Sequence, residues 1–152
     1  MPTLKERIDT DLKEAMRSKS ELKTSVVRML KSAIKYKEVE PGASALDDAG
    51  IEKVIAGLIK QRRDSVDQFK AAGRDDLAQK EADEITILQA YLPQQLTADE
   101  LRAEVTAAIA AVGAKSAKEM GAVMKHLQPK VAGRAEGRLV SEEVKAQLAK
   151  LS

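Results

Sequence analysis

Positive side chains and glycines alternate in the last third of the chain, and their types and spacing favour binding over catalysis. Glycine lets a backbone approach a ligand closely, and cations supply the attraction that dominates affinity for nucleic-acid phosphates. The pattern predicts a surface for a polyanion, made by Lys118, Lys125, Lys130, Gly133, Arg134 and Arg138. An alternative stays open, in which Gly133 and Gly137 only permit a turn between two helices.

A second candidate patch consists of Arg28, Lys31 and Lys35, whose i, i+3, i+7 spacing puts them on one helix face. Residues 13–37 contain eight basic and two acidic side chains, and residues 113–138 contain six and two. The formal charge of the whole chain is only +2, so the prediction rests on where the basic residues cluster and not on the net charge. Ordinary solubilising charge explains the Arg28 patch equally well.

No set of residues able to run a reaction is evident. Cysteine is absent, which excludes disulfides, thiolate zinc sites and cysteine nucleophiles. The single histidine, His126, has no nucleophile motif beside it, so a solvated histidine or an extra phosphate contact is favoured. Glu81, Asp83 and Glu84 lack the glycine turn of a calcium loop and are interpreted as a solvated helix face. We therefore expect no catalytic residue, no metal site and no cofactor.

Aromatic residues are too few for a base-stacking surface. The chain contains Phe69, Tyr36 and Tyr91 and no tryptophan, whereas proteins that stack the bases of single strands use several rings. The sequence also lacks the glycine-rich loops that bind nucleotide phosphates. We expect contacts with an RNA backbone and no readout of DNA sequence.

The elements that must position these side chains are all predicted to be helical. Nearly every segment shows the 3.6-residue period of apolar residues, and none sustains the alternation of a strand. Pro93 disfavours helix in the residue before it, and Thr97 with Glu100 forms a capping box. The prediction is an all-α protein, with a four-helix N-terminal domain (residues 1–93) and a three-helix C-terminal domain (residues 94–152).

The basic segment is predicted to be a loop from Pro129 to Gly137, between the last two helices. Ser116 is expected to cap the helix before it, and Ser141 the helix after it. Glu142 and Glu143 would then complement the positive end of the last helix.

No apolar run approaches the roughly 18 residues of a membrane-spanning helix. The first residues also lack the apolar segment of a secretory signal. We therefore expect a cytoplasmic protein with no membrane partner.

Three stretches of the chain resemble the GatB/YqeY family. The first runs from Arg28 to Lys35. The second comprises residues 60–65 with Phe69, residues 72–78 and the segment from Tyr91 to Leu96. The third comprises residues 120–125, 133–135 and 140–141.

The third stretch is similar to the tail of the B subunit of the glutamine-dependent aminoacyl-tRNA amidotransferase. The resemblance implies a stand-alone protein made of that helical module, which contacts tRNA in the larger enzyme. By position, Lys125 and Arg134 correspond to cations of the tail motif, and Arg134 stands where the subunit typically has lysine. The family label, a carbon–nitrogen ligase with glutamine as amido donor, belongs to an enzyme whose catalysis occurs in other domains.

Our main hypothesis is an RNA-binding accessory protein whose expected partner is tRNA. The second hypothesis is participation in tRNA-dependent amidation, alone or with amidotransferase or other tRNA-related proteins. A third is a helical protein–protein adaptor.

Overall fold

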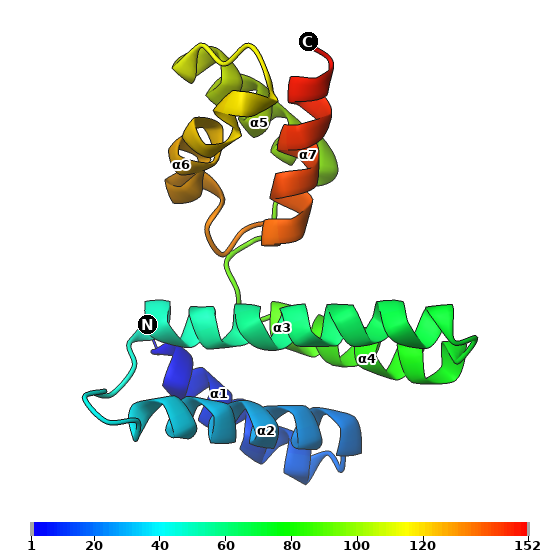
Figure 1. The fold of residues 1–152 in the computed structure, drawn as a ribbon. Helices are drawn as coiled ribbons and strands as arrows, with labels where there is room; N and C mark the ends of the chain where they lie inside the picture. Colours follow the sequence, from blue (N-terminus) through cyan, green and yellow to red (C-terminus); the bar gives the residue numbers. More distant parts are fainter. Residues whose placement is uncertain (1, 152) are drawn as a thin grey trace. The chain divides into compact units, whose positions relative to one another are not determined.

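The computed structural model describes residues 2–151, and their regular structure is entirely helical (Figure 1). Seven α-helices and one 3₁₀ turn occur in this range, and no strand does. The prediction of an all-α protein is therefore confirmed. The described backbone forms two compact units, one on each side of the bond between Leu92 and Pro93.

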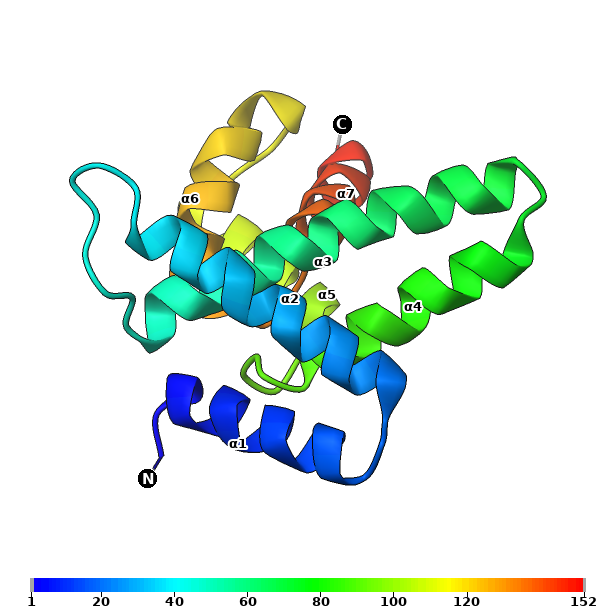
Figure 2. The same cartoon turned by 90° about the horizontal axis from the view of Figure 1, so that it is seen from below.

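The N-terminal unit contains four helices: α1 (Leu4–Arg17), α2 (Glu21–Glu38), α3 (Asp48–Ala71) and α4 (Asp75–Gln89). Helices α1 and α2 pack as one hairpin, and α3 and α4 pack as a second, longer hairpin (Figures 1 and 2). Their apolar stripes meet in one core, where Ile8, Leu30 and Ile55 are almost fully buried. This burial fixes which face of each helix is left for polar side chains.

Tyr91 fastens the end of α4 to α1. Its ring is 4% exposed, and its hydroxyl donates a hydrogen bond of 2.5 Å to Asp11 Oδ2. The Arg7 guanidinium lies 5.5 Å from the ring centre, within cation–π range. Burial raises the pKa of the Tyr91 phenol well above its usual value of about 10, and the Asp11 carboxylate raises it further. The contact therefore depends on a protonated phenol.

The C-terminal unit contains α5 (Ala98–Val112), the 3₁₀ turn η1 (Ala117–Glu119), α6 (Met120–Val131) and α7 (Gly137–Ala149). These three α-helices pack on one another around Val105, Leu127 and Val144, which are completely buried. The capping box at the start of α5 is confirmed. Glu100 N donates to Thr97 Oγ1 (3.1 Å), and Thr97 N donates to Glu100 Oε1 (3.0 Å).

The predicted loop from Pro129 to Gly137 is wrong at both ends. Helix α6 continues through Pro129 to Val131, so only residues 132–136 lie between the helices. Val131 is 4% exposed and extends the buried stripe of Leu127 by one turn. A proline this close to the C-terminus removes a single hydrogen bond, and burial of Val131 offsets that loss.

Neither serine caps its helix as predicted. Helix α7 begins at Gly137, which puts Ser141 inside it and Glu142 beyond its first turn. The physical reason is Val140, which is 2% exposed and starts the buried stripe before the serine. Ser116 precedes the 3₁₀ turn η1, and its side chain makes no capping hydrogen bond.

The two glycines of the α6–α7 connection have different backbone conformations. Gly133 has a φ of +73°, in the left-handed region where a Cβ is unfavourable. Gly137 has no positive φ, and a Cβ built on it meets no atom within 4 Å. Gly133 is therefore required by the turn, and Gly137 is not.

We predict that Gly133→Ala lowers the free energy of unfolding by about 1–2 kcal/mol, because an L-residue is strained in this conformation. Urea denaturation followed by circular dichroism measures the change. Gly137→Ala is the matched control and should be neutral or slightly stabilising, since it adds a methyl group at a helical position. Equal destabilisation by the two substitutions would contradict this account of the turn.

We predict that Tyr91→Phe lowers the free energy of unfolding by about 1–3 kcal/mol, the usual range for a hydrogen bond to a charged group. Because the folded-state pKa of the phenol is raised, its stabilisation is fully present below about pH 10 and is lost as the pH rises further. Denaturation at several pH values should show that the difference in free energy of unfolding between the wild type and the variant becomes smaller above pH 10. Tyr36→Phe, at a site that is 71% exposed, should have the same free energy of unfolding as the wild type at every pH.

Candidate nucleic-acid interface

Helix α6 leaves its lysines exposed to solvent and contains no acidic residue. Val123, Leu127 and Val131 are buried against the rest of the unit at i, i+4, i+8 spacing. Lys125 and Lys130 are left exposed to solvent. Because the sequence of α6 contains no aspartate or glutamate, no carboxylate of this helix offsets their charge.

The predicted cations are spread along the molecule and do not form one tight cluster. Lys118 belongs to η1, before the first residue of α6, whereas Arg134 follows its last residue. Twelve helical residues separate the two positions, a rise of about 18 Å. Lys125 and Lys130 are five positions apart, which turns them about 140° from each other around the helix axis.

The segment after Pro93 holds Arg134 in place. Leu96 N donates to Arg134 O (2.7 Å), and Arg134 Nε donates to Gln94 O (3.2 Å). Gln95 Nε2 donates to Gly133 O (2.8 Å). Sequence reasoning missed this contact, and the only local signal was the pair of glutamines after Pro93. Arg134 therefore has a structural function, whether or not it also meets a phosphate.

Two carboxylates lie near these arginines. Arg138 Nε is 3.6 Å from Glu142 Oε1, one helical turn along α7. The pKa of Glu100 is lowered mainly by its hydrogen bonds with Thr97 and, more weakly, by the charge of Arg134. Part of the positive charge at this end of α6 is therefore offset within the unit.

Three of the five predicted cations have no such partner. Lys118, Lys125 and Lys130 are exposed and make no side-chain ion pair or hydrogen bond within residues 2–151. We call these three residues the α6 surface. Its charges are available to an external anion without the loss of an internal contact.

The second predicted patch is less uniform than its spacing indicates. On α2, Lys31 forms a 2.8 Å ion pair with Asp9 of α1, and an Arg28 guanidinium nitrogen lies 3.3 Å from Met16 Sδ. Lys35 makes no ion pair among the described residues. The three cations therefore have three different environments.

No group of three or more histidine, cysteine, aspartate or glutamate side chains is arranged to hold a metal ion in the described part of the chain. None of its helices is long and apolar enough to cross a membrane.

Comparison with known proteins finds related sequences in yeasts. A protein of Eremothecium gossypii is 42% identical over 82 residues, which cover 54% of this chain and 45% of the relative. A protein of Saccharomyces cerevisiae is 40% identical over 91 residues, which cover 60% of this chain and 49% of the relative. A protein of Lachancea thermotolerans is 38% identical over 99 residues, which cover 65% of this chain and 52% of the relative. The chain thus spans about half the length of these relatives, each named "Altered inheritance of mitochondria protein 41, mitochondrial".

These names correct the expected cytoplasmic location. The relatives are named as mitochondrial proteins, and a cytoplasmic assignment does not agree with them. The expectation rested on the lack of an apolar secretory signal and of a spanning helix. Neither property separates the cytoplasm from the mitochondrion, because mitochondrial targeting segments are amphipathic rather than apolar.

A family profile covers both structural units. The profile described as "Yqey-like protein" matches residues 5–148, which extend from α1 to α7 and include the whole α6 surface. The three stretches that resemble the family in the sequence all fall inside this match. The chain belongs to the Yqey-like protein family.

Proposed function

We propose that the C-terminal unit is an accessory module that binds tRNA, with the RNA backbone lying along the α6 surface. The observation that carries this proposal is the exposure of Lys118, Lys125 and Lys130 without a carboxylate partner in the described residues. Lysine ammonium groups bind phosphates as point charges and release the counterions condensed on the nucleic acid.

The spread of the cations favours a polymer over a single small anion. Lys118 lies before α6 and Lys130 lies in its last turn, so the surface extends over most of a helix about 18 Å long. A phosphodiester chain presents charges along such a length, whereas one phosphate group contacts only neighbouring side chains. Phosphate contacts of this kind position a nucleic acid and carry no base sequence.

The loop after α6 continues this surface. Gly133 gives the turn its left-handed conformation, and it is followed by Arg134 in the same turn and by Arg138 in the first turn of α7. Arg134 Nε donates to Gln94 O, and no other hydrogen bond or ion pair of this side chain occurs within residues 2–151. We expect Arg134 and Arg138 to add weaker contacts, because part of their charge is offset by Glu100 and Glu142.

The choice of tRNA among RNAs rests on the resemblance of residues 120–125, 133–135 and 140–141 to the tail of the amidotransferase B subunit. That tail contacts tRNA, and Lys125 and Arg134 correspond to its cations. We do not propose amide transfer by this chain, because no specific contact among the described side chains supports it.

We predict that replacing Lys125 and Lys130 together with alanine weakens tRNA binding at low salt. The logarithm of the binding constant falls as the logarithm of the salt concentration rises. Each lost phosphate contact should make this slope less steep by about 0.7–0.9, so loss of the pair should make it less steep by about 1.4–1.8. Fluorescence anisotropy with labelled tRNA over a range of salt concentrations gives both the affinity and the slope.

The matched control replaces two exposed lysines of the same unit, Lys145 within α7 and Lys150 directly after its last residue. This control removes the same charge and should change the slope by much less. Absence of tRNA binding by the wild type at low salt would refute the proposal, and so would equal losses for the two double variants.

A further inference from the structure

The N-terminal unit contains a hollow between α1 and α2 that no proposed RNA contact uses. Its volume is about 450 Å³, within the usual range for small-ligand sites. The lining residues come from the first turns of α1 and the last turns of α2: Lys5, Ile8, Asp9, Lys31, Ser32, Ile34, Lys35, Glu38 and Val39. Ile8 and Ile34 belong to the lining but are almost fully buried, so the apolar side chain that the hollow presents to solvent is Val39, which is 69% exposed.

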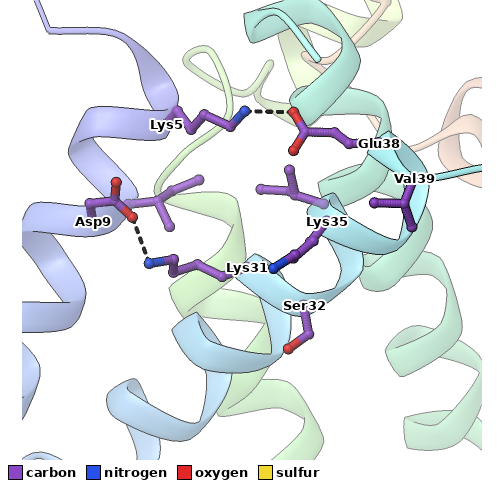
Figure 3. Close-up of a pocket in the computed structure, with 9 residues that line it drawn as sticks. Lys5, Asp9, Lys31, Ser32, Lys35, Glu38 and Val39 are labelled. Carbon is purple, nitrogen blue, oxygen red and sulfur yellow. Dashed lines mark hydrogen bonds and ion pairs between the residues drawn. The ribbon is translucent and has the colours of Figure 1, made fainter. Parts of the chain in front are cut away.

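Two ion pairs join the helices across this hollow. Lys5 Nζ lies 2.5 Å from Glu38 Oε2, and Lys31 Nζ lies 2.8 Å from Asp9 Oδ1 (Figure 3). Glu38 also accepts a hydrogen bond of 2.8 Å from Leu46 N. The hydrogen bond from Lys5, followed by that from Leu46, holds the pKa of Glu38 below its usual value, so this carboxylate is ionised at neutral pH.

Lys35 is the cation of the hollow that lacks a carboxylate. It lies on α2 between Lys31 and Glu38, and no dashed line reaches it in Figure 3. No ion pair or hydrogen bond of its ammonium group occurs within residues 2–151. The lining of the hollow contains three lysines and two carboxylates, so its net charge is +1.

We propose that this hollow binds a small organic carboxylate with an apolar body, whose anionic group meets Lys35 and whose body packs on Val39, one turn further along the chain. Ser32, one turn before Lys35 and also part of the lining, offers a hydroxyl donor to the same anionic group. The proposal concerns the N-terminal unit and does not depend on RNA binding by the C-terminal unit.

The charges at the hollow select a monoanion over a dianion. A phosphate monoester would bring a second negative charge toward Asp9 and Glu38, whose lysine partners are already engaged. Like charges placed close together are disfavoured, most of all where water is partly excluded. An anion without an apolar body would leave Val39 exposed and would lose that part of the affinity.

The test uses the full chain labelled with ¹⁵N and titrated with octanoate, 1-octanol, octyl phosphate or acetate, with amide shifts as the measurement. Octanoate should shift the amides of residues 5–9 and 31–39 at millimolar concentration. Octanol, octyl phosphate and acetate should each bind more weakly there. Lys35→Met keeps the apolar stem of the side chain, removes its charge and should weaken octanoate binding about tenfold, as for loss of a hydrogen bond to a charged group.

Lys37→Met is the matched control, since Lys37 lies on the same helix, pairs with Glu40 at 3.6 Å and does not line the hollow. It should leave the octanoate affinity unchanged, as should the Lys125 and Lys130 double variant. Absence of octanoate shifts in residues 5–9 and 31–39 would overturn the proposal. It would also fail if Lys35→Met bound octanoate like the wild type, or if octanol or octyl phosphate bound as tightly as octanoate.

Discussion

Burial of one side of α6 is the constraint on which the proposed RNA surface depends. Val123 and Leu127 have no exposed area, and this pair fixes the rotation of the helix within its bundle. Residues that fall between them in sequence, such as Lys125, must then face solvent. Since α6 contains no carboxylate, the same packing that stabilises the unit leaves its lysines as unpaired charges.

Some cations of the protein are paired with carboxylates and others are not, and this difference bears on function more than the total charge does. In the N-terminal unit, Lys5 and Lys31 of neighbouring helices are each paired with a carboxylate, so those cations help to hold α1 against α2. Surface pairs of this kind contribute little stability, yet they reduce the charge available to a ligand. Lys35 and the α6 surface have no such pair within residues 2–151, and each has surroundings suited to a different class of anion.

Local patterns predicted the helices well because helical periodicity and caps depend on neighbouring residues. The Thr97–Glu100 capping box was found from the sequence for this reason. The same local rules failed at Pro129 and Ser141, where burial of nearby valines extended α6 and started α7 early. Local patterns also could not identify partners that are distant in the sequence, such as Asp9 and Lys31, which are 22 positions apart. The hollow could not be predicted for the same reason, because its lining comes from two helices and the sequence of either helix alone does not indicate it.

The most direct test of the α6 surface is the rate of lysine modification with and without bound tRNA. The chain would be treated with an amine-reactive reagent, and mass spectrometry would give the extent of reaction at each lysine. The account predicts that tRNA protects Lys118, Lys125 and Lys130 and leaves Lys145 and Lys150 reactive. Equal protection of all five lysines, or protection confined to the N-terminal unit, would contradict it.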